Sequence, residues 1–127
     1  MKTKMLCGTL LVAAAGLLVA QRPAPPPPVL MGDDGSIIAA HRTVHRKNGE
    51  TVNWGRQTAG QRTWYVKFSQ SPCREGAEFG HDRATACTIS VACNKAGDAA
   101  CKSYKYSSAT LSTAAMHDPD IMVDPTQ

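Results

Sequence analysis

Four cysteines in the second half of the chain carry the clearest potential chemistry, because thiolates form disulfides or hold zinc. They are Cys73, Cys87, Cys93 and Cys101. Structural zinc sites usually contain close pairs such as C-x2-C, whereas 13, 5 and 7 residues separate these cysteines. An even number of cysteines in a small exported chain is typical of a disulfide framework. We therefore predict that all four cysteines form disulfides.

The spacing of these cysteines excludes one of the three possible pairings. Residues 87–93 alternate in polarity, which predicts a strand with Cys87, Ile89, Val91 and Cys93 on one face. Two residues six positions apart on a straight strand lie about 20 Å from each other, and a disulfide needs Cα atoms within roughly 7 Å. We therefore predict that Cys87 does not bond Cys93, and the two remaining connectivities stay open.

The sequence contains no familiar catalytic motif. It has no G-x-S-x-G, no H-E-x-x-H, no C-x-x-C and no phosphate-binding glycine loop. Glu75, Glu78 and Asp82 cluster near His81, but glycines interrupt this stretch, which is typical of a solvated loop. We expect a protein that is not an enzyme.

Alternation of apolar and polar residues predicts the strands that position these groups. It is clearest where Trp64, Val66 and Phe68 point one way and Tyr65 and Lys67 point the other. Two later stretches repeat it: Tyr104 and Tyr106 share one face of a strand, and Ile121 and Val123 share one face of another. Glycine and proline separate the strands. The predicted fold is mainly β, a small antiparallel β-sandwich or partial barrel stapled by disulfides, after an N-terminal signal helix.

Residues 36–49 fit two local structures. As a helix, the stretch would begin at the N-cap Ser36 and end at Gly49 in the left-handed C′ position. As a hairpin, Asn48-Gly49 would form a type I′ turn between His41–Lys47 and Glu50–Trp54. We favour the hairpin because Asn-Gly is a strong turn signal and strands follow it.

The N-terminus has the composition of an export signal. Lys2 and Lys4 precede an apolar run from Met5 to Ala20, which is shorter than the roughly 20 residues that comfortably span a membrane. A run of prolines follows, and proline favours an extended spacer. The predicted organisation is a signal peptide over 1–20, a Pro-rich linker over 21–35 and a disulfide-stapled β domain over 36–127.

Three strand motifs give the chain a resemblance to known families. The Trp-x-Val-x-Phe, Tyr-Lys-Tyr and Asp-Pro-Asp-Ile-Met-Val segments resemble strands of small exported bacterial cupredoxin-like or immunoglobulin-like domains, over about residues 50–125. His117 and Met122 have the H-x4-M spacing of the last two ligands in blue-copper proteins, so the resemblance implies them as copper ligands. The thiolate ligand departs from that pattern, because Cys101 lies 16 residues before His117 and is predicted to be oxidised.

Charge and compartment limit the expected partners. The chain has 14 basic and 10 acidic residues, and removing Lys2 and Lys4 with the signal leaves 12 against 10, a formal charge of +2. This charge is too small to predict nucleic acid as a partner.

We expect a periplasmic or secreted, non-catalytic binding or structural module of the bacterial envelope, without a cofactor. Its partner would be a protein or envelope component that contacts Tyr65 and Lys67, and membrane contact would occur only through an uncleaved signal segment. The alternative is a cupredoxin-like copper-binding protein.

Overall fold

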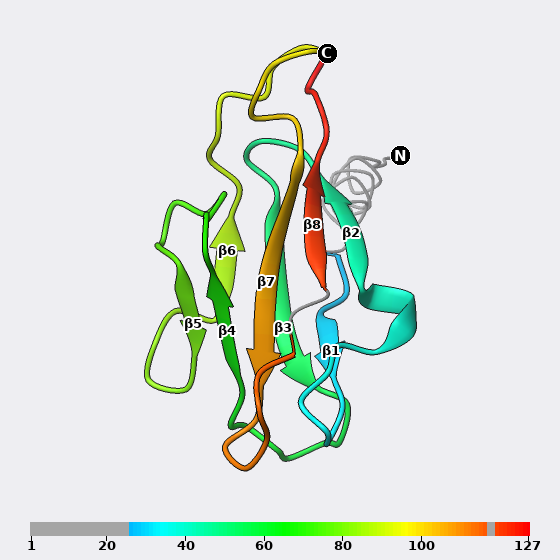
Figure 1. Cartoon of the computed structure of the whole chain (residues 1–127), viewed down its shortest axis with the longest axis vertical. Helices are drawn as coiled ribbons and strands as arrows, with labels where there is room; N and C mark the ends of the chain where they lie inside the picture. Colours follow the sequence, from blue (N-terminus) through cyan, green and yellow to red (C-terminus); the bar gives the residue numbers. More distant parts are fainter. Residues whose placement is uncertain (1–25, 117–118) are drawn as a thin grey trace, which may run out of the picture.

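The chain folds into a mainly β domain with little helix (Figure 1). The structure is a computed structural model and describes residues 26–116 and 119–127. In chain order the elements are β1 (Val29–Met31), the 3-10 turn η1 (Ala39–His41), β2 (Thr43–Arg46), β3 (Thr51–Arg56), β4 (Tyr65–Phe68), β5 (Glu78–Gly80), β6 (Ala86–Thr88), β7 (Ser103–Ala109) and β8 (Asp120–Val123). The predicted signal segment, residues 1–20, lies outside the described residues. Within the described ranges, no helix has the length and hydrophobicity of a membrane span.

The strands form two sheets with mixed strand directions. One has the order β1-β3-β6 and the other β2-β8-β7-β4-β5. The pairs β1–β3 and β2–β8 are parallel, and the other pairs are antiparallel. The prediction of a mainly β fold is confirmed, but the prediction that it is antiparallel throughout is wrong. Parallel neighbours need long connections, and both parallel pairs join strands that are distant in sequence, so no local turn signal indicates them.

An aromatic cluster fills the space between the two sheets. Trp54 on β3 lies 6.0 Å from Trp64, 5.2 Å from Phe79 and 5.7 Å from Tyr106, measured between ring centroids. Phe68 joins them on β4. The predicted inward set of residues 64, 66 and 68 is buried at 5% exposure or less. Alternation along β4 therefore identified the core face correctly.

The predicted hairpin at Asn48-Gly49 is wrong, although the turn exists. The amide of Glu50 donates to the carbonyl of Lys47 at 3.0 Å, and Gly49 has a φ of +86°. Asn48 keeps a negative φ, whereas a type I′ turn needs positive φ at both central residues. After this turn the chain crosses from β2 in the five-stranded sheet to β3 in the three-stranded sheet, so the two strands do not pair with each other. The helical alternative is also wrong, because the turn η1 is the whole of the helix between residues 36 and 49.

The predicted linker over 21–35 ends earlier than expected. Val29 and Met31 on β1 are buried in the core at 2% and 0% exposure, and β1 pairs with β3. Pro26–Pro28 are exposed, and residues 21–25 lie outside the described ranges. Alternation of apolar and polar residues is hard to recognise in a strand of three residues that follows a run of prolines. The strand β1 forms because it pairs with β3, which lies far away in the sequence.

The two disulfides join Cys73 to Cys87 and Cys93 to Cys101, with Cα–Cα distances of 5.1 Å and 4.9 Å. This confirms that all four cysteines pair and that Cys87 does not bond Cys93. The first disulfide ties the β4–β5 connection to β6, and so links segments of the two sheets. The second closes the connection between β6 and β7. The strand predicted over residues 87–93 is shorter than expected, because β6 ends at Thr88.

The buried phenol of Tyr106 predicts a loss of stability at alkaline pH. Its hydroxyl has no hydrogen-bond partner in the part of the chain that the structure describes. Burial raises the pKa of Tyr106 to about 12, and the nearby indole N–H of Trp54 opposes part of that rise. Tyrosine in the unfolded chain ionises near pH 10. Between these values the folded chain binds more protons than the unfolded chain, so stability falls as pH rises.

We expect this phenol to cost about 1.4 kcal/mol of unfolding free energy at pH 11 relative to pH 8. Tyr106→Phe should remove that part of the loss, which urea unfolding at the two pH values measures. Tyr104→Phe is the comparison variant, because the Tyr104 hydroxyl donates to the Ala100 carbonyl at 2.9 Å. It should cost about 1 kcal/mol already at pH 8. Equal losses for wild type and Tyr106→Phe would contradict the prediction.

Candidate functional site

The predicted contact residues Tyr65 and Lys67 lie on the outward face of β4. Lys67 is exposed and Tyr65 is half-buried, while Val66 and Phe68 between and after them face the core. On the neighbouring strand β7, Ser107 is the register partner of Lys67. Together with Ser69, Lys105 and Tyr106, these two residues line a shallow hollow of about 320 Å³. We call it the outer hollow.

Two lysines line the outer hollow, and their acidic neighbours contact other groups. Glu78, the register partner of Lys67 on β5, forms an ion pair with Arg83 at 3.4 Å. Asp120, the register partner of Lys105 on β8, accepts hydrogen bonds from the hydroxyls of Thr43 and Ser103. Among the described residues, neither Lys67 nor Lys105 forms an ion pair. Their ammonium groups are therefore available to an anionic partner.

The structure places one of the two predicted copper ligands. Met122 is half-buried on the outward face of β8, where its register partners are His45 on β2 and Ser103 on β7. His45 contacts Asp124 through Nδ1 at 3.0 Å. His117 lies outside the described residues, so the pairing of His117 with Met122 stays a prediction. Across ranges 26–116 and 119–127, no three His, Cys, Asp or Glu side chains gather as metal ligands.

A second concave site lies at one end of the domain, where three loops meet. The loops follow β1, β3 and β7, and they run close together at the lower end of the molecule in Figure 1. They enclose a pocket of about 330 Å³. We call it the loop-end pocket; its lining residues are Asp33, Arg56, Gln61, Thr63, Thr110, Leu111 and Ser112.

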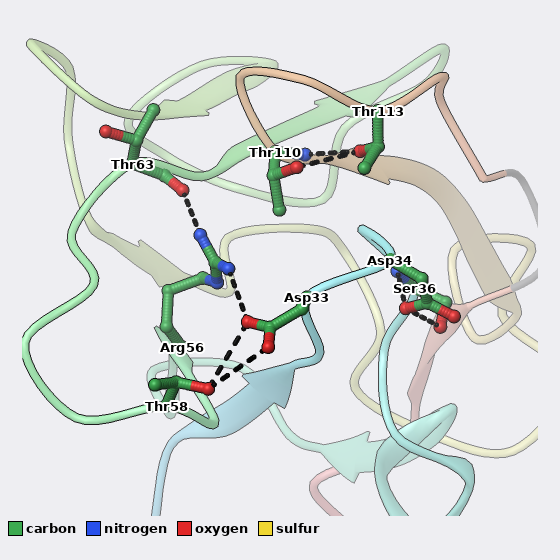
Figure 2. Close-up of polar contacts among 8 residues, drawn as sticks. All are labelled: Asp33, Asp34, Ser36, Arg56, Thr58, Thr63, Thr110 and Thr113. Carbon is green, nitrogen blue, oxygen red and sulfur yellow. Dashed lines mark hydrogen bonds and ion pairs between the residues drawn. The ribbon is translucent and has the colours of Figure 1, made fainter.

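Arg56 is the basic residue that lines the loop-end pocket. Its side chain is only 7% exposed. One terminal nitrogen donates to the carbonyl of Thr63 at 2.8 Å and the other to Asp33 Oδ1 at 2.9 Å (Figure 2). Nε is buried without a partner among the residues described. Asp33, in contrast, has a side chain that is 76% exposed and also accepts from Thr58 at 3.2 Å.

The predictions from sequence missed Arg56, although a signal for it exists. Val52 and Trp54 face the core from β3, and Arg56 is the next residue on that face because strand side chains alternate. The strand predicted from the sequence ended at Trp54, one step too early. A charged residue that continues the buried face of a strand is uncommon, and it marks the position where the sheet opens into the loop-end pocket.

Hydrogen bonds within the first and third loops fix the backbone beside this pocket. Asp34 accepts from the amide and hydroxyl of Ser36 at 3.0 and 2.7 Å, and these bonds lower the pKa of Asp34. Thr113 Oγ1 accepts from the amide and hydroxyl of Thr110 at 2.9 and 3.0 Å (Figure 2). At Gly35, with a φ of +85°, a Cβ would collide with the side chain of Thr113. The first and third loops therefore pack closely against each other.

Comparison with known proteins gave no family model, no curated protein and no solved structure that matches this chain.

Proposed function

We propose that the protein is an exported, non-catalytic binding module of the bacterial envelope. The predicted signal segment supports this, and two disulfides are compatible with an oxidising, exported location. The proposed contact surface is the outward face of the five-stranded sheet around the outer hollow.

The pair Lys67 and Lys105 is the observation that carries this proposal. Both lysines line one concave surface, and neighbouring acidic groups are engaged elsewhere. Serine hydroxyls at 69 and 107 add hydrogen-bonding groups between them. Tyr65 lies half-buried on the same outward face of β4, and tyrosine is a frequent anchor of protein interfaces. The partner is therefore an anionic protein or envelope component.

The experiment places a photo-crosslinking amino acid at position 65 of the full chain in an exporting bacterium. We expect one discrete adduct at this position and none at Asn53, a half-buried position on β3 in the other sheet. The double variant Lys67→Glu with Lys105→Glu should reduce the adduct at least about fivefold, because reversed charges repel an anionic partner.

Two further measurements make this test specific. Both lysines are exposed, but each substitution places a glutamate opposite an acidic register partner, Glu78 or Asp120. The double variant should therefore stay folded and lose about 1 kcal/mol of unfolding free energy. Raising the salt concentration before irradiation should also weaken the adduct, since screening shortens the range of surface charges. An adduct that forms equally at position 53, or one unaffected by charge reversal, would contradict the proposal.

A further inference from the structure

We propose that the loop-end pocket is a second binding site, which takes a carboxylate that carries an adjacent apolar group. A blocked apolar amino acid has this chemistry, and so does the C-terminus of a peptide that ends in an apolar residue. The site shares no residue with the outer hollow, so it does not depend on the function proposed above.

The donors of Arg56 are the first observation. A guanidinium has five N–H donors. Among the described residues, the Thr63 carbonyl accepts from one terminal nitrogen of Arg56 and Asp33 Oδ1 accepts from the other. Nε is left buried without an acceptor in the described part of the chain. Burying such a charge is costly unless it is paired and hydrogen-bonded. The edge formed by Nε and a terminal nitrogen matches the two oxygens of a carboxylate, which bind side by side.

The exposure of Asp33 shows how a ligand reaches this edge. Asp33 holds one terminal nitrogen of Arg56 through a single oxygen, and its side chain is 76% exposed. The Arg56 end of this ion pair is buried, and leaving a buried charge without a partner is costly. Asp33 therefore moves into water only as another carboxylate replaces it on Arg56. A ligand carboxylate takes its place on the terminal nitrogen of Arg56, and it gains the buried Nε–H as well where it enters more deeply than Asp33 does. Asp33 is therefore a competitor of the ligand.

Leu111 indicates the apolar part of the ligand. It lines the loop-end pocket beside Ser112 and is 77% exposed, more than any other large apolar side chain among the described residues. The pocket of about 330 Å³ lies within the range of small-molecule sites. A phosphate dianion fits less well, because Asp33 and Asp34 repel a second negative charge more strongly and Leu111 offers it no donor.

The experiment is an NMR titration of the full chain with N-acetyl-L-leucine. We expect a Kd of about a millimolar, given the size of this ligand, with shifts centred on the three loops. N-acetyl-L-leucinamide lacks the charge and acetate lacks the apolar group, so each should bind at least about tenfold more weakly. Equal binding of the amide, or tighter binding of inorganic phosphate, would overturn the proposal.

Three substitutions test the roles of the pocket residues. Arg56→Gln should weaken N-acetyl-L-leucine at least about tenfold. Asp33→Asn should tighten it several-fold, because the competitor loses its charge. Leu111→Ser should weaken N-acetyl-L-leucine several-fold but leave acetate unchanged. Leu111 is exposed, so its variant keeps the fold even if Arg56→Gln does not. In Asp33→Asn the side-chain oxygen still accepts the hydrogen bond from Arg56. Unchanged or weaker binding to Asp33→Asn would refute the competition.

Two last comparisons separate the ligand sources and the two sites. If N-acetyl-Ala-Ala-Leu binds more tightly than N-acetyl-L-leucine, the site takes a peptide C-terminus; if the two bind equally, it takes a small free acid, and both results support the carboxylate site. The variant Lys67→Glu with Lys105→Glu should bind N-acetyl-L-leucine like wild type. A loss of binding in this variant would show that the carboxylate binds at the outer hollow, and would refute the proposal.

Discussion

Removing both disulfides is expected to leave the domain largely unfolded at 37 °C. The Cys73–Cys87 bond joins residues 14 positions apart and the Cys93–Cys101 bond residues 8 apart. In the chain-entropy description these loops correspond to about 3 and about 2.5 kcal/mol of stability. Their sum is comparable to the whole net stability of a small domain, about 5 to 15 kcal/mol. The core is thin for a chain of this size, so little stability remains to offset the loss.

The measurement is urea unfolding of wild type and of one variant for each bridge. The variants are Cys73→Ala with Cys87→Ala, and Cys93→Ala with Cys101→Ala. Alanine is preferred to serine because Cys87 and Cys93 are fully buried and a buried hydroxyl would add a separate cost. The first variant should lose more stability, because it opens the longer loop and frees the β4–β5 connection from β6. A protein reduced at both bridges that melts like the oxidised one would contradict this expectation.

Truncating a core aromatic residue should have the second largest effect. Phe68 is 2% exposed and lies 5.1 Å from Tyr106 and 6.2 Å from both Trp54 and Phe79, between ring centroids. Phe68→Ala should therefore cost about 3 to 5 kcal/mol, which combines lost burial with a cavity. Trp64→Ala should cost a similar amount because Trp64 is 5% exposed in the same cluster.

Tyr65→Ala is the matched control for the core variants, since it changes the neighbouring residue on the opposite face of β4. We expect thermal melts to show a small loss for this variant and a large one for Phe68→Ala. A Tyr65→Ala melt as low as that of Trp64→Ala would mean that the sheet faces are assigned the wrong way round. The outer hollow could then not be a free surface, and the proposed contact face would be wrong with it.

Local patterns in the sequence were sufficient for the faces of the strands. Side chains alternate across a strand whatever its neighbours are. The buried positions of Trp64, Val66 and Phe68 and the outward position of Lys67 could therefore be predicted. The exclusion of a Cys87–Cys93 bond is confirmed, although the straight strand from which it was argued ends at Thr88. Local spacing could not choose between the two remaining pairings, because both require knowing which distant segments meet.

The partners of the strands could not be predicted in the same way. Asn48-Gly49 is a real turn, but β2 continues into one sheet and β3 into the other, because β8 and β1 are their parallel neighbours. Neither contact has a signal within a short window of sequence. The candidate sites show the same division: Lys67 was found from the alternation of its own strand, whereas Lys105 joins it only through the pairing of β4 with β7.

The sequence by itself determined the strand faces, the outward position of Tyr65 and Lys67, and the oxidised state expected of four cysteines, because each depends on residues close together in the chain. The tertiary structure alone decided the mixed sheets, the disulfide partners and the loop-end pocket. Arg56 is an ordinary charged residue in the sequence; it becomes a buried donor only because three loops from distant parts of the chain close around it. Contacts between distant segments depend on the packing of the whole core, and no local pattern of residues records them.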